Sequence, residues 1–174
     1  GWLNPLSAAI IASLSDLQVR EGWRGGICEI GVHHGKLFLL LALAALPGEK
    51  CVAIDVFGRQ DLNLDGSGKG DRAIFEANMQ RHGVLAGNVQ IVEKSSLEVS
   101  GAQVRELAGP LRLFSVDGGH TEECIRNDMA ITDDCIADHG VIVIDDVFNG
   151  SWPSVASGYV RYLLDAPGTV PFAI

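Results

Sequence analysis

Short apolar runs alternate along most of the chain with longer stretches in which apolar residues recur every three to four positions. The short runs are rich in Ile and Val and predict strands, because β-branched residues suit a pleated, buried surface. We expect strands at residues 27–32, 51–56, 89–92, 111–116, 141–144 and 170–174. The amphipathic stretches predict helices at residues 4–18, 71–82, 103–107, 121–139 and 153–163, and residues 36–46, which are apolar on every face, predict a buried helix. This alternation indicates an α/β fold: a doubly wound, mostly parallel, Rossmann-like sheet with right-handed crossovers and helices on both faces.

The first predicted strand runs into a glycine turn that opens the next helix. Gly31 and Gly35 let the backbone turn sharply and approach a ligand closely, and doubly wound folds bind nucleotides at such a turn. A dinucleotide-binding turn needs glycine at the position of Glu29, whose carboxylate would repel a pyrophosphate. The phosphate-loop spacing is absent too, because Lys36 is followed by Leu37 rather than by Ser or Thr. The turn therefore predicts a nucleoside ligand without phosphates that carries a positive charge.

Other strand ends also suit a nucleoside. Asp55 ends the second predicted strand, roughly 20 residues after the turn, the interval at which an acidic side chain accepts hydrogen bonds from a ribose. Ser95 and Ser96 follow the third strand, where this fold usually holds an adenine. A turn-capping aspartate and serines that cap the next element are the alternatives. The predicted cofactor-binding set comprises Glu29, Gly31, Val32, Gly35, Asp55, Val56, Ser95, Ser96 and Asp117.

Three aspartates follow the fourth and fifth predicted strands. Asp117 ends the fourth, and Asp145 and Asp146 end the fifth. The carboxyl ends of parallel strands meet at one edge, and strands joined by a single helix are commonly neighbours, so these side chains should share a crevice. Clustered carboxylates repel one another unless protons or a cation offset the repulsion, and oxygen ligands suit Mg²⁺. We therefore predict a metal site at Asp117, Asp145 and Asp146, with simple turn capping as the alternative.

The glycine turn resembles a known motif. Glu29-x-Gly31-x-x-x-Gly35 is similar to the first motif of class I S-adenosylmethionine-dependent methyltransferases. The resemblance implies that S-adenosylmethionine, which is a nucleoside with a positive charge and no phosphate, is the ligand of the turn.

The acidic positions carry a second resemblance. Asp117-Gly-Gly-His120, followed later in the chain by Asp145-Asp146, resembles the metal-dependent O-methyltransferases of the macrocin and mycinamicin type. This resemblance implies that the three aspartates hold Mg²⁺ and that His120 is the catalytic general base. It also implies O-methylation of a hydroxyl on a small molecule or a sugar.

Three other functions remain open from the sequence. An NAD-linked oxidoreductase is disfavoured by Glu29, for the reason given above. A metal-dependent phosphoesterase would use the same acidic cluster. A non-catalytic cofactor-binding domain is the third alternative, since the chain stops within its last predicted strand. An irregular stretch rich in Gly, Asp and Asn, residues 57–70, is either a substrate-contacting loop or a flexible insertion.

Composition and charge limit the partners and the location that we expect for the protein. The net charge is −9 and the 13 Lys and Arg are scattered, which argues against a nucleic-acid partner. With no spanning or signal segment recognised, we expect no membrane partner and a cytoplasmic location. Four isolated cysteines in apolar segments indicate buried, reduced thiols. We interpret residues 1–174 as a single domain, excised from a longer chain, with residues 1–24 as a lead-in helix and the last strand missing. The sequence leaves open the acceptor, the metal requirement and the oligomeric state, a homo-oligomer included.

Overall fold

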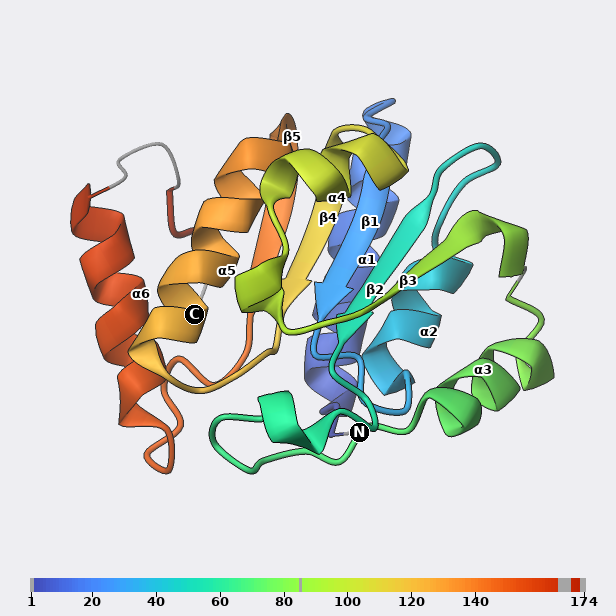
Figure 1. Ribbon diagram of the computed structural model, residues 1–174. Coiled ribbons are helices and arrows are strands. Elements are labelled where there is room, and N and C mark those ends of the chain that lie inside the picture. Colours follow the sequence, from blue (N-terminus) through green and yellow to red (C-terminus); the bar gives the residue numbers. More distant parts are fainter. Residues whose placement is uncertain (1, 85, 166–169, 173–174) are drawn as a thin grey trace.

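The computed structural model describes residues 2–84, 86–165 and 170–172. Within these residues the chain forms one parallel sheet of five strands in the order β3-β2-β1-β4-β5 (Figure 1). The strands are β1 (Gly26–Ile30), β2 (Cys51–Asp55), β3 (Val89–Glu93), β4 (Leu111–Val116) and β5 (Ile136–Ile144). The helices are α1 (Pro5–Arg20), α2 (Lys36–Leu43), α3 (Arg72–Arg81), α4 (Gly101–Ala108), α5 (Glu122–Cys135) and α6 (Pro153–Asp165). The predicted α/β, Rossmann-like fold class is confirmed.

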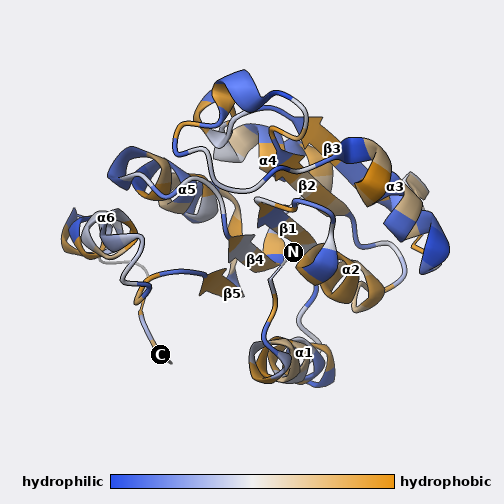
Figure 2. Cartoon of the chain, turned by 90° about the horizontal axis from the view of Figure 1, so that it is seen from below, coloured by the Kyte–Doolittle hydropathy of each residue, from blue (hydrophilic) through white to orange (hydrophobic). Residues whose placement is uncertain are grey.

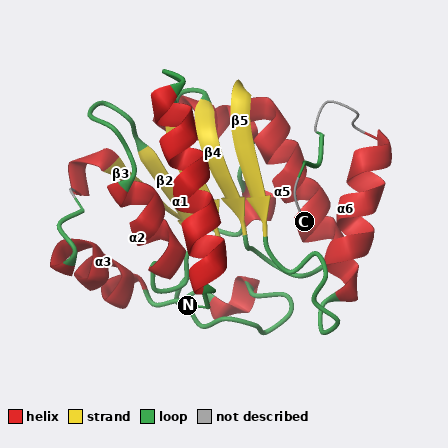
Figure 3. Ribbon diagram, turned by 180° about the vertical axis from the view of Figure 1, so that it is seen from behind, coloured by secondary structure: helices red, strands yellow, loops and turns green. Residues whose placement is uncertain are grey.

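Helices cover both faces of the sheet, which explains why the strand residues are mainly apolar. Figures 2 and 3 show α1 and α2 on one side of the sheet and α4 and α5 on the other. Successive side chains of a strand enter different cores, as their alternation across a pleated sheet requires. Ile27 and Ala53 pack with residues of α2 and α3, whereas Cys28 and Val52 pack with residues of α4 and α5. All four cysteines are buried free thiols, as expected.

The sheet order places a switch point between β1 and β4. From β1 the chain proceeds outward to β2 and β3, and then returns to add β4 on the other side of β1. The last residues of β1, β4 and β5 are in register, with Ile30 opposite Val116 and Val116 opposite Ile144. In Figure 1 the arrowheads of the strands point to one edge, where the loop between β2 and α3 also lies. Open α/β sheets bind their ligands at this edge, beside the switch point.

The lead-in helix α1 is attached to the sheet by a buried polar network. Arg112 of β4 donates to both carboxylate oxygens of Glu49 and to the carbonyl oxygen of Ala44. The same guanidinium donates to Ser15 Oγ and Gln18 Oε1 on α1, at 3.0 Å each. Arg112 is 1% exposed and Glu49 7%, so this ion pair is buried with its hydrogen bonds satisfied. This network attaches α1 to the amino-terminal end of β4, at the edge of the sheet opposite the one where the strands end.

The boundary between α5 and β5 differs from the prediction. The periodicity predicts a helix to about residue 139 and a strand from residue 141, but α5 ends at Cys135 and β5 begins at Ile136. Leu111 pairs with Ile136 and Leu113 pairs with Val141, so the intervening residues of β5 form an irregularity in the ladder. Ile136 is extended, with ψ of 144°. Helical spacing could not show this, because Ile136 lies one turn after the buried Thr132 and is β-branched, so it suits either element.

Two further predictions differ from the structure. The helix after the glycine turn ends at Leu43 rather than at residue 46, and Leu43 is 59% exposed, so this helix is not buried on every face as its composition indicates. Phe38 and Leu41 alone among its residues are buried. Residues 170–172 form no strand, and the rest of the sixth strand predicted at 170–174 lies outside the described residues. Within the described part of the chain, every helix is too short or too polar to span a bilayer.

Candidate active site

A cavity of about 580 Å³ opens at the carboxyl-terminal edge of the sheet. Its walls come from the turn after β1, the loop of residues 56–71 after β2, the Ser95–Ser96 turn, and the loops after β4 and β5. The predicted site residues that line it are Glu29, Gly31, Val32, Asp55, Val56, Ser95, Ser96, Asp117, His120, Asp145 and Asp146. Gly35 does not line it. Both predicted motifs therefore face one cavity, since every strand of a parallel sheet ends at the same edge.

The two glycines of the turn make room mainly for other parts of the protein. Both have positive φ, 88° at Gly31 and 85° at Gly35. A Cβ atom at Gly31 would overlap the carbonyl oxygen of Asp117, and one at Gly35 would lie 2.7 Å from the ring of Phe75. Gly31 thus allows the ends of β1 and β4 to approach, and Gly35 seats the turn against α3. The sequence predicted that the backbone at Gly31 would lie close to a ligand. In the structure, the backbone of Asp117 also lies close to Gly31.

Glu29 presents an unsatisfied carboxylate to the cavity. It lies in the centre of the sheet and is 2% exposed, and its Oε2 atom has no hydrogen-bond partner. Burial, and then the charges of Asp117, Asp55 and Asp145, raise the pKa of Glu29 well above its ordinary value. An orphaned buried carboxylate is costly unless a cation or a donor completes it. The position therefore fits a ligand that carries an ammonium or hydroxyl group.

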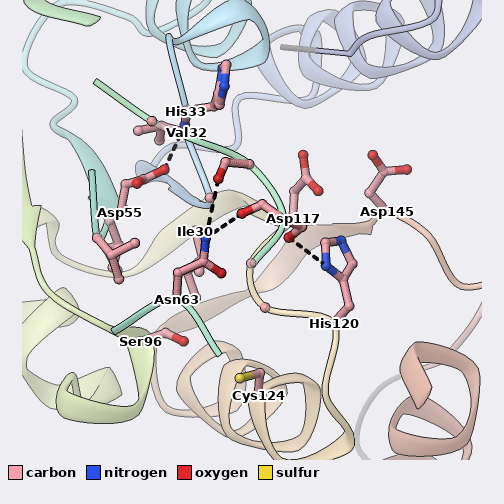
Figure 4. Close-up of a pocket in the computed structure, with 18 of the residues that line it drawn as sticks. Ile30, Val32, His33, Asp55, Asn63, Ser96, Asp117, His120, Cys124 and Asp145 are labelled. Carbon is pink, nitrogen blue, oxygen red and sulfur yellow. Dashed lines mark hydrogen bonds between the residues drawn. The ribbon is translucent and has the colours of Figure 1, made fainter. Parts of the chain in front are cut away.

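Asp55 is bonded to the turns around it. Its Oδ2 atom accepts a hydrogen bond from the His33 amide at 2.7 Å, and its Oδ1 atom accepts one from the Phe57 amide at 2.6 Å (Figure 4 draws the first). His33 and Phe57 both have positive φ, 50° and 44°. Burial raises the pKa of Asp55, while these two amide hydrogen bonds act in the opposite direction. Asp55 therefore shapes the cavity by holding two strained turns, in addition to facing it.

Of the two serines after β3, Ser95 caps the next element, which was one of the two predicted roles. Ser95 Oγ accepts a hydrogen bond from the Leu97 amide at 3.3 Å and so caps the following 3₁₀ turn, Ser96–Glu98. Ser96 is buried, and its carbonyl oxygen accepts a hydrogen bond from Asn127 of α5. The side chain of Asp128, next along α5, is buried and accepts a hydrogen bond from Asn127 at 3.4 Å. Helix α5 thus supports the turn that was predicted to hold an adenine.

Asp117 belongs to a cluster of acidic and imidazole side chains that lines the same cavity. One ligand atom from each of Asp117, His120 and Asp146 lies within 4.8 Å of the others, and this is the group of possible metal ligands found among the described residues. Asp145 lines the same cavity, and its carboxylate points to the same side as that of Asp117 in Figure 4. Burial, and then the charges of Asp145 and Asp146, raise the pKa of Asp117 to about 8.

The donors of this cluster suit a hard divalent ion. Carboxylate oxygens, which the three aspartates supply, are ligands that suit Mg²⁺ or Mn²⁺, whereas an imidazole nitrogen suits other transition metals better. The crowding of negative charge that raises the pKa of Asp117 is the repulsion that a cation would relieve. Asp146 is held in a left-handed conformation, φ 60°, by Asp145 Oδ1 accepting from its amide and by Asn149 donating to its Oδ1. The residues present therefore fit a metal ion.

The surroundings of His120 include residues that the sequence motifs did not identify. Its Nδ1 atom lies 2.8 Å from Asp65 Oδ2 and 3.1 Å from Ser67 Oγ, and its Nε2 atom lies 3.0 Å from Asp146 Oδ2. The indole of Trp152 stacks on the imidazole, with centroids 4.2 Å apart and planes at 12°. The one sequence signal for Asp65 and Ser67 was the long polar loop that contains them, whose contacts no spacing specifies.

Comparison with known proteins agrees with this geometry. Over residues 28–147 the sequence matches a protein family described as a methyltransferase domain. No curated protein sequence matches the chain significantly.

Solved structures share the fold at low sequence identity. The O-methyltransferase NovP has a TM-score of 0.77 at 14% identity, covering 91% of this chain and 71% of NovP. TomG, an O-methyltransferase from Streptomyces achromogenes involved in tomaymycin synthesis, has a TM-score of 0.70 at 18% identity, covering 97% of this chain and 71% of TomG. CalS11, a TDP-rhamnose 3'-O-methyltransferase, has a TM-score of 0.70 at 18% identity, covering 99% of this chain and 77% of CalS11. The sequence match and the shared fold together confirm the resemblance to class I methyltransferases, and the chain belongs to the methyltransferase-domain family.

Proposed function

We propose that the protein transfers the methyl group of S-adenosylmethionine to a hydroxyl oxygen of a small molecule or sugar, with the help of a bound divalent cation, Mg²⁺ in the first instance. One observation carries the proposal: the orphaned carboxylate of Glu29 and the cluster of Asp117, His120 and Asp146 line the same cavity. Asp117 belongs to the cluster, and its charge also acts on Glu29. A methyl donor and a hydroxyl could thus meet above it.

The cofactor half of the cavity suits S-adenosylmethionine. The orphaned Glu29 oxygen can accept a hydrogen bond from the ammonium group of the methionine part. Asp55 lines the wall at the end of β2, where a ribose would lie, and Ser95 and Ser96 line it after β3. Two similar structures, TomG and an O-methyltransferase from Bacillus cereus, were solved with S-adenosylmethionine and S-adenosylhomocysteine respectively. They support this choice of cofactor.

The acceptor half of the cavity suits deprotonation of a hydroxyl. Asp117 and Asp146, with Asp145 beside them, would hold the cation, which would lower the pKa of an acceptor hydroxyl. His120 Nε2 faces this cluster and would take the hydroxyl proton. The acceptor oxygen then forms a bond to the methyl carbon while the bond from that carbon to sulfur breaks, which leaves S-adenosylhomocysteine. Holding both reactants in one cavity supplies much of the acceleration.

The acceptor class rests on the neighbours and on the cavity rim. NovP, TomG and CalS11 are named as O-methyltransferases, and CalS11 acts on TDP-rhamnose. Trp2 and Leu64 line the cavity and are strongly exposed. Such side chains at a rim would pack against the face of a ring. These features favour a ring-bearing small molecule or sugar as acceptor.

The cofactor is tested by isothermal titration of the full chain with S-adenosylmethionine and S-adenosylhomocysteine. We expect both to bind, and we expect Glu29→Gln to bind them more weakly. Absence of binding would refute the proposal, and binding of NADH instead would replace it with the oxidoreductase alternative.

The metal is tested by activity in the presence of a chelator. Release of S-adenosylhomocysteine is measured against a panel of hydroxylated acceptors, with and without EDTA. We expect EDTA to abolish activity, Mg²⁺ to restore it, and Asp145→Asn to remove it. Asp138→Asn, an exposed position elsewhere on β5, is the control and should retain activity. Full activity in EDTA would refute the metal and leave methyl transfer in place.

A further inference from the structure

Charge is unevenly distributed around the cavity. Its described lining includes five carboxylates and two lysines: Glu29, Asp55, Asp117, Asp145 and Asp146, with Lys36 and Lys94. An anionic group inside the cavity is therefore repelled along most of the wall. Beside either lysine it would instead be attracted, so the lysines mark the places where the negative charge of a ligand can lie.

The two lysines lie at the ends of different strands. Lys36 is the first residue of α2 and belongs to the turn after β1, whereas Lys94 directly follows β3. Because β2 separates β1 from β3 in the sheet, the strands that carry the two lysines are about 10 Å apart. Figure 4 shows the same order along one side of the cavity, with His33 after β1, Asp55 at the end of β2 and Ser96 after β3. A ligand group that contacts Lys36 is thus remote from Lys94.

Lys36 can bind a further acceptor. Its Nζ atom donates to the carbonyl oxygen of Leu3 at 3.3 Å, in an exposed contact. An ammonium group has three donors, so this contact leaves donors for an anion. Gly35, the N-cap of α2, has no side chain to accept from the first helical amides, and Leu37 of the first turn also lines the cavity. The positive end of the α2 dipole therefore adds to the attraction of Lys36 for an anion.

The carboxylate at the other end of this turn has the opposite requirement. Glu29 is 2% exposed and its Oε2 atom has no partner among the described residues, so a cation or a donor would complete it. Glu29 and Lys36 both line the cavity. An acid and a base on one turn suit a ligand that carries an ammonium and a carboxylate close together. An α-amino acid has this pattern, with both groups on one carbon atom.

The ligand group follows from this pattern together with the proposed function, on which the inference rests. S-adenosylmethionine ends in an α-amino acid. We propose that Lys36 binds the carboxylate of this methionine part, while Glu29 binds its ammonium group. The turn after β1 thereby separates the two charged groups of the cofactor, and the carboxylate is held apart from Asp117, Asp145 and Asp146.

Isothermal titration of the full chain with two ligands tests this assignment. S-adenosylhomocysteine contains the whole amino acid. Its decarboxylated analogue keeps the adenosine, the sulfur and the amine, but lacks the carboxylate. We expect the wild-type protein to bind S-adenosylhomocysteine about fivefold more tightly than the analogue, because an exposed ion pair contributes at most about this factor.

Lys36→Met keeps the apolar stem of the side chain and removes its charge. We expect this variant to bind S-adenosylhomocysteine about fivefold more weakly than the wild type does. Its affinity for the analogue should change by less than about twofold, since the analogue has no group that meets Lys36. Lys36→Arg keeps the charge and should retain most of the affinity for S-adenosylhomocysteine.

Two other variants serve as controls. Lys94→Met removes the second cavity lysine and should leave the ratio of the two affinities unchanged. Glu29→Gln should weaken the binding of both ligands, because both carry the ammonium group. The melting temperature of each variant shows whether its fold is intact, and Lys36→Ala repeats the test if Lys36→Met fails to fold.

Two results would overturn the role of Lys36. One is equal affinity of the wild-type protein for the two ligands, which would show that the carboxylate gains nothing on binding. The other is an equal loss for both ligands in Lys36→Met, which would leave Lys36 only the structural role of fastening Leu3. In that case S-adenosylhomocysteine still binds the wild type and the proposed function stands, whereas absence of wild-type binding would refute the function and this inference with it.

Discussion

Replacing Arg112 with methionine should destabilise the protein more than any surface change of the same kind. The substitution keeps a long apolar stem and removes a guanidinium that is 1% exposed and donates to Glu49, Ser15, Gln18 and Ala44. Glu49 would be left as a buried carboxylate without its counter-ion. Breaking a buried ion pair from one side costs about 3–5 kcal/mol, and a small domain has only about 5–15 kcal/mol in total. We expect a loss of about 4 kcal/mol.

Urea unfolding followed by circular dichroism measures this loss, with the slope of the transition checked for constancy. Arg72→Met is the control, since Arg72 pairs with Glu76 and Glu93 at the surface and such pairs contribute about 0–1 kcal/mol. The double variant Arg112→Met, Glu49→Met should recover a large part of the loss, because it leaves no unpaired charge. A loss below about 1 kcal/mol for Arg112→Met, or no recovery in the double variant, would refute the reasoning.

Three other substitutions test the site and its supports. Glu29→Gln should weaken binding of S-adenosylhomocysteine about tenfold, which corresponds to roughly 1.4 kcal/mol of binding free energy. It should not lower the melting temperature, because it removes a buried charge that nothing offsets. A marked drop in melting temperature would contradict this reasoning. Asp128 is buried, and its pKa is raised to about 6 from an ordinary 3.8. The folded state therefore binds the Asp128 proton more tightly than the unfolded state does. As pH rises from about 4 to 6, the charge on Asp128 should progressively lower the free energy of unfolding, by at most about 3 kcal/mol. Relative to wild type, Asp128→Asn should therefore gain stability over that interval in urea titrations at stepped pH, and a constant difference would rule this out. Gly31→Ala should lower the free energy of unfolding by several kcal/mol in the same assay and weaken cofactor binding, since the added Cβ overlaps the Asp117 carbonyl at a φ of +88°. Gly83 also has positive φ but faces open space, so the control Gly83→Ala should cost only about 1 kcal/mol. Equal losses in the two variants would show that the overlap at Gly31 is relieved cheaply.

The strands of the sheet were predictable because their signal is local. Each contains a short run of mainly apolar residues, and burial on both faces makes such runs nearly continuous. The boundary between α5 and β5 was not, because Ile136 continues a helical spacing and also pairs with Leu111 in the sheet. Which of the two it does depends on contacts with β4, which the local pattern does not contain.

The site was predictable in outline for a topological reason. Strands that run parallel end at one edge, so Asp55, Asp117 and Asp145 had to face a common space once the strands were identified. The finer roles were not predictable in this way. Gly31 accommodates the backbone of Asp117, and Asp55 holds the amides of two turns, and both facts depend on how closely the strand ends approach.

The chain's own residue order was enough to derive the fold class, the cavity edge and the residues that converge there, since these follow from periodicity and from the direction of parallel strands. The partners of His120 came from the folded molecule alone. Asp65 reaches it across 55 positions because a polar loop without periodicity is held in one path by Asn63 and by the cavity wall. A loop conformation is the sum of many weak contacts that are distant in sequence, so no local pattern encodes it.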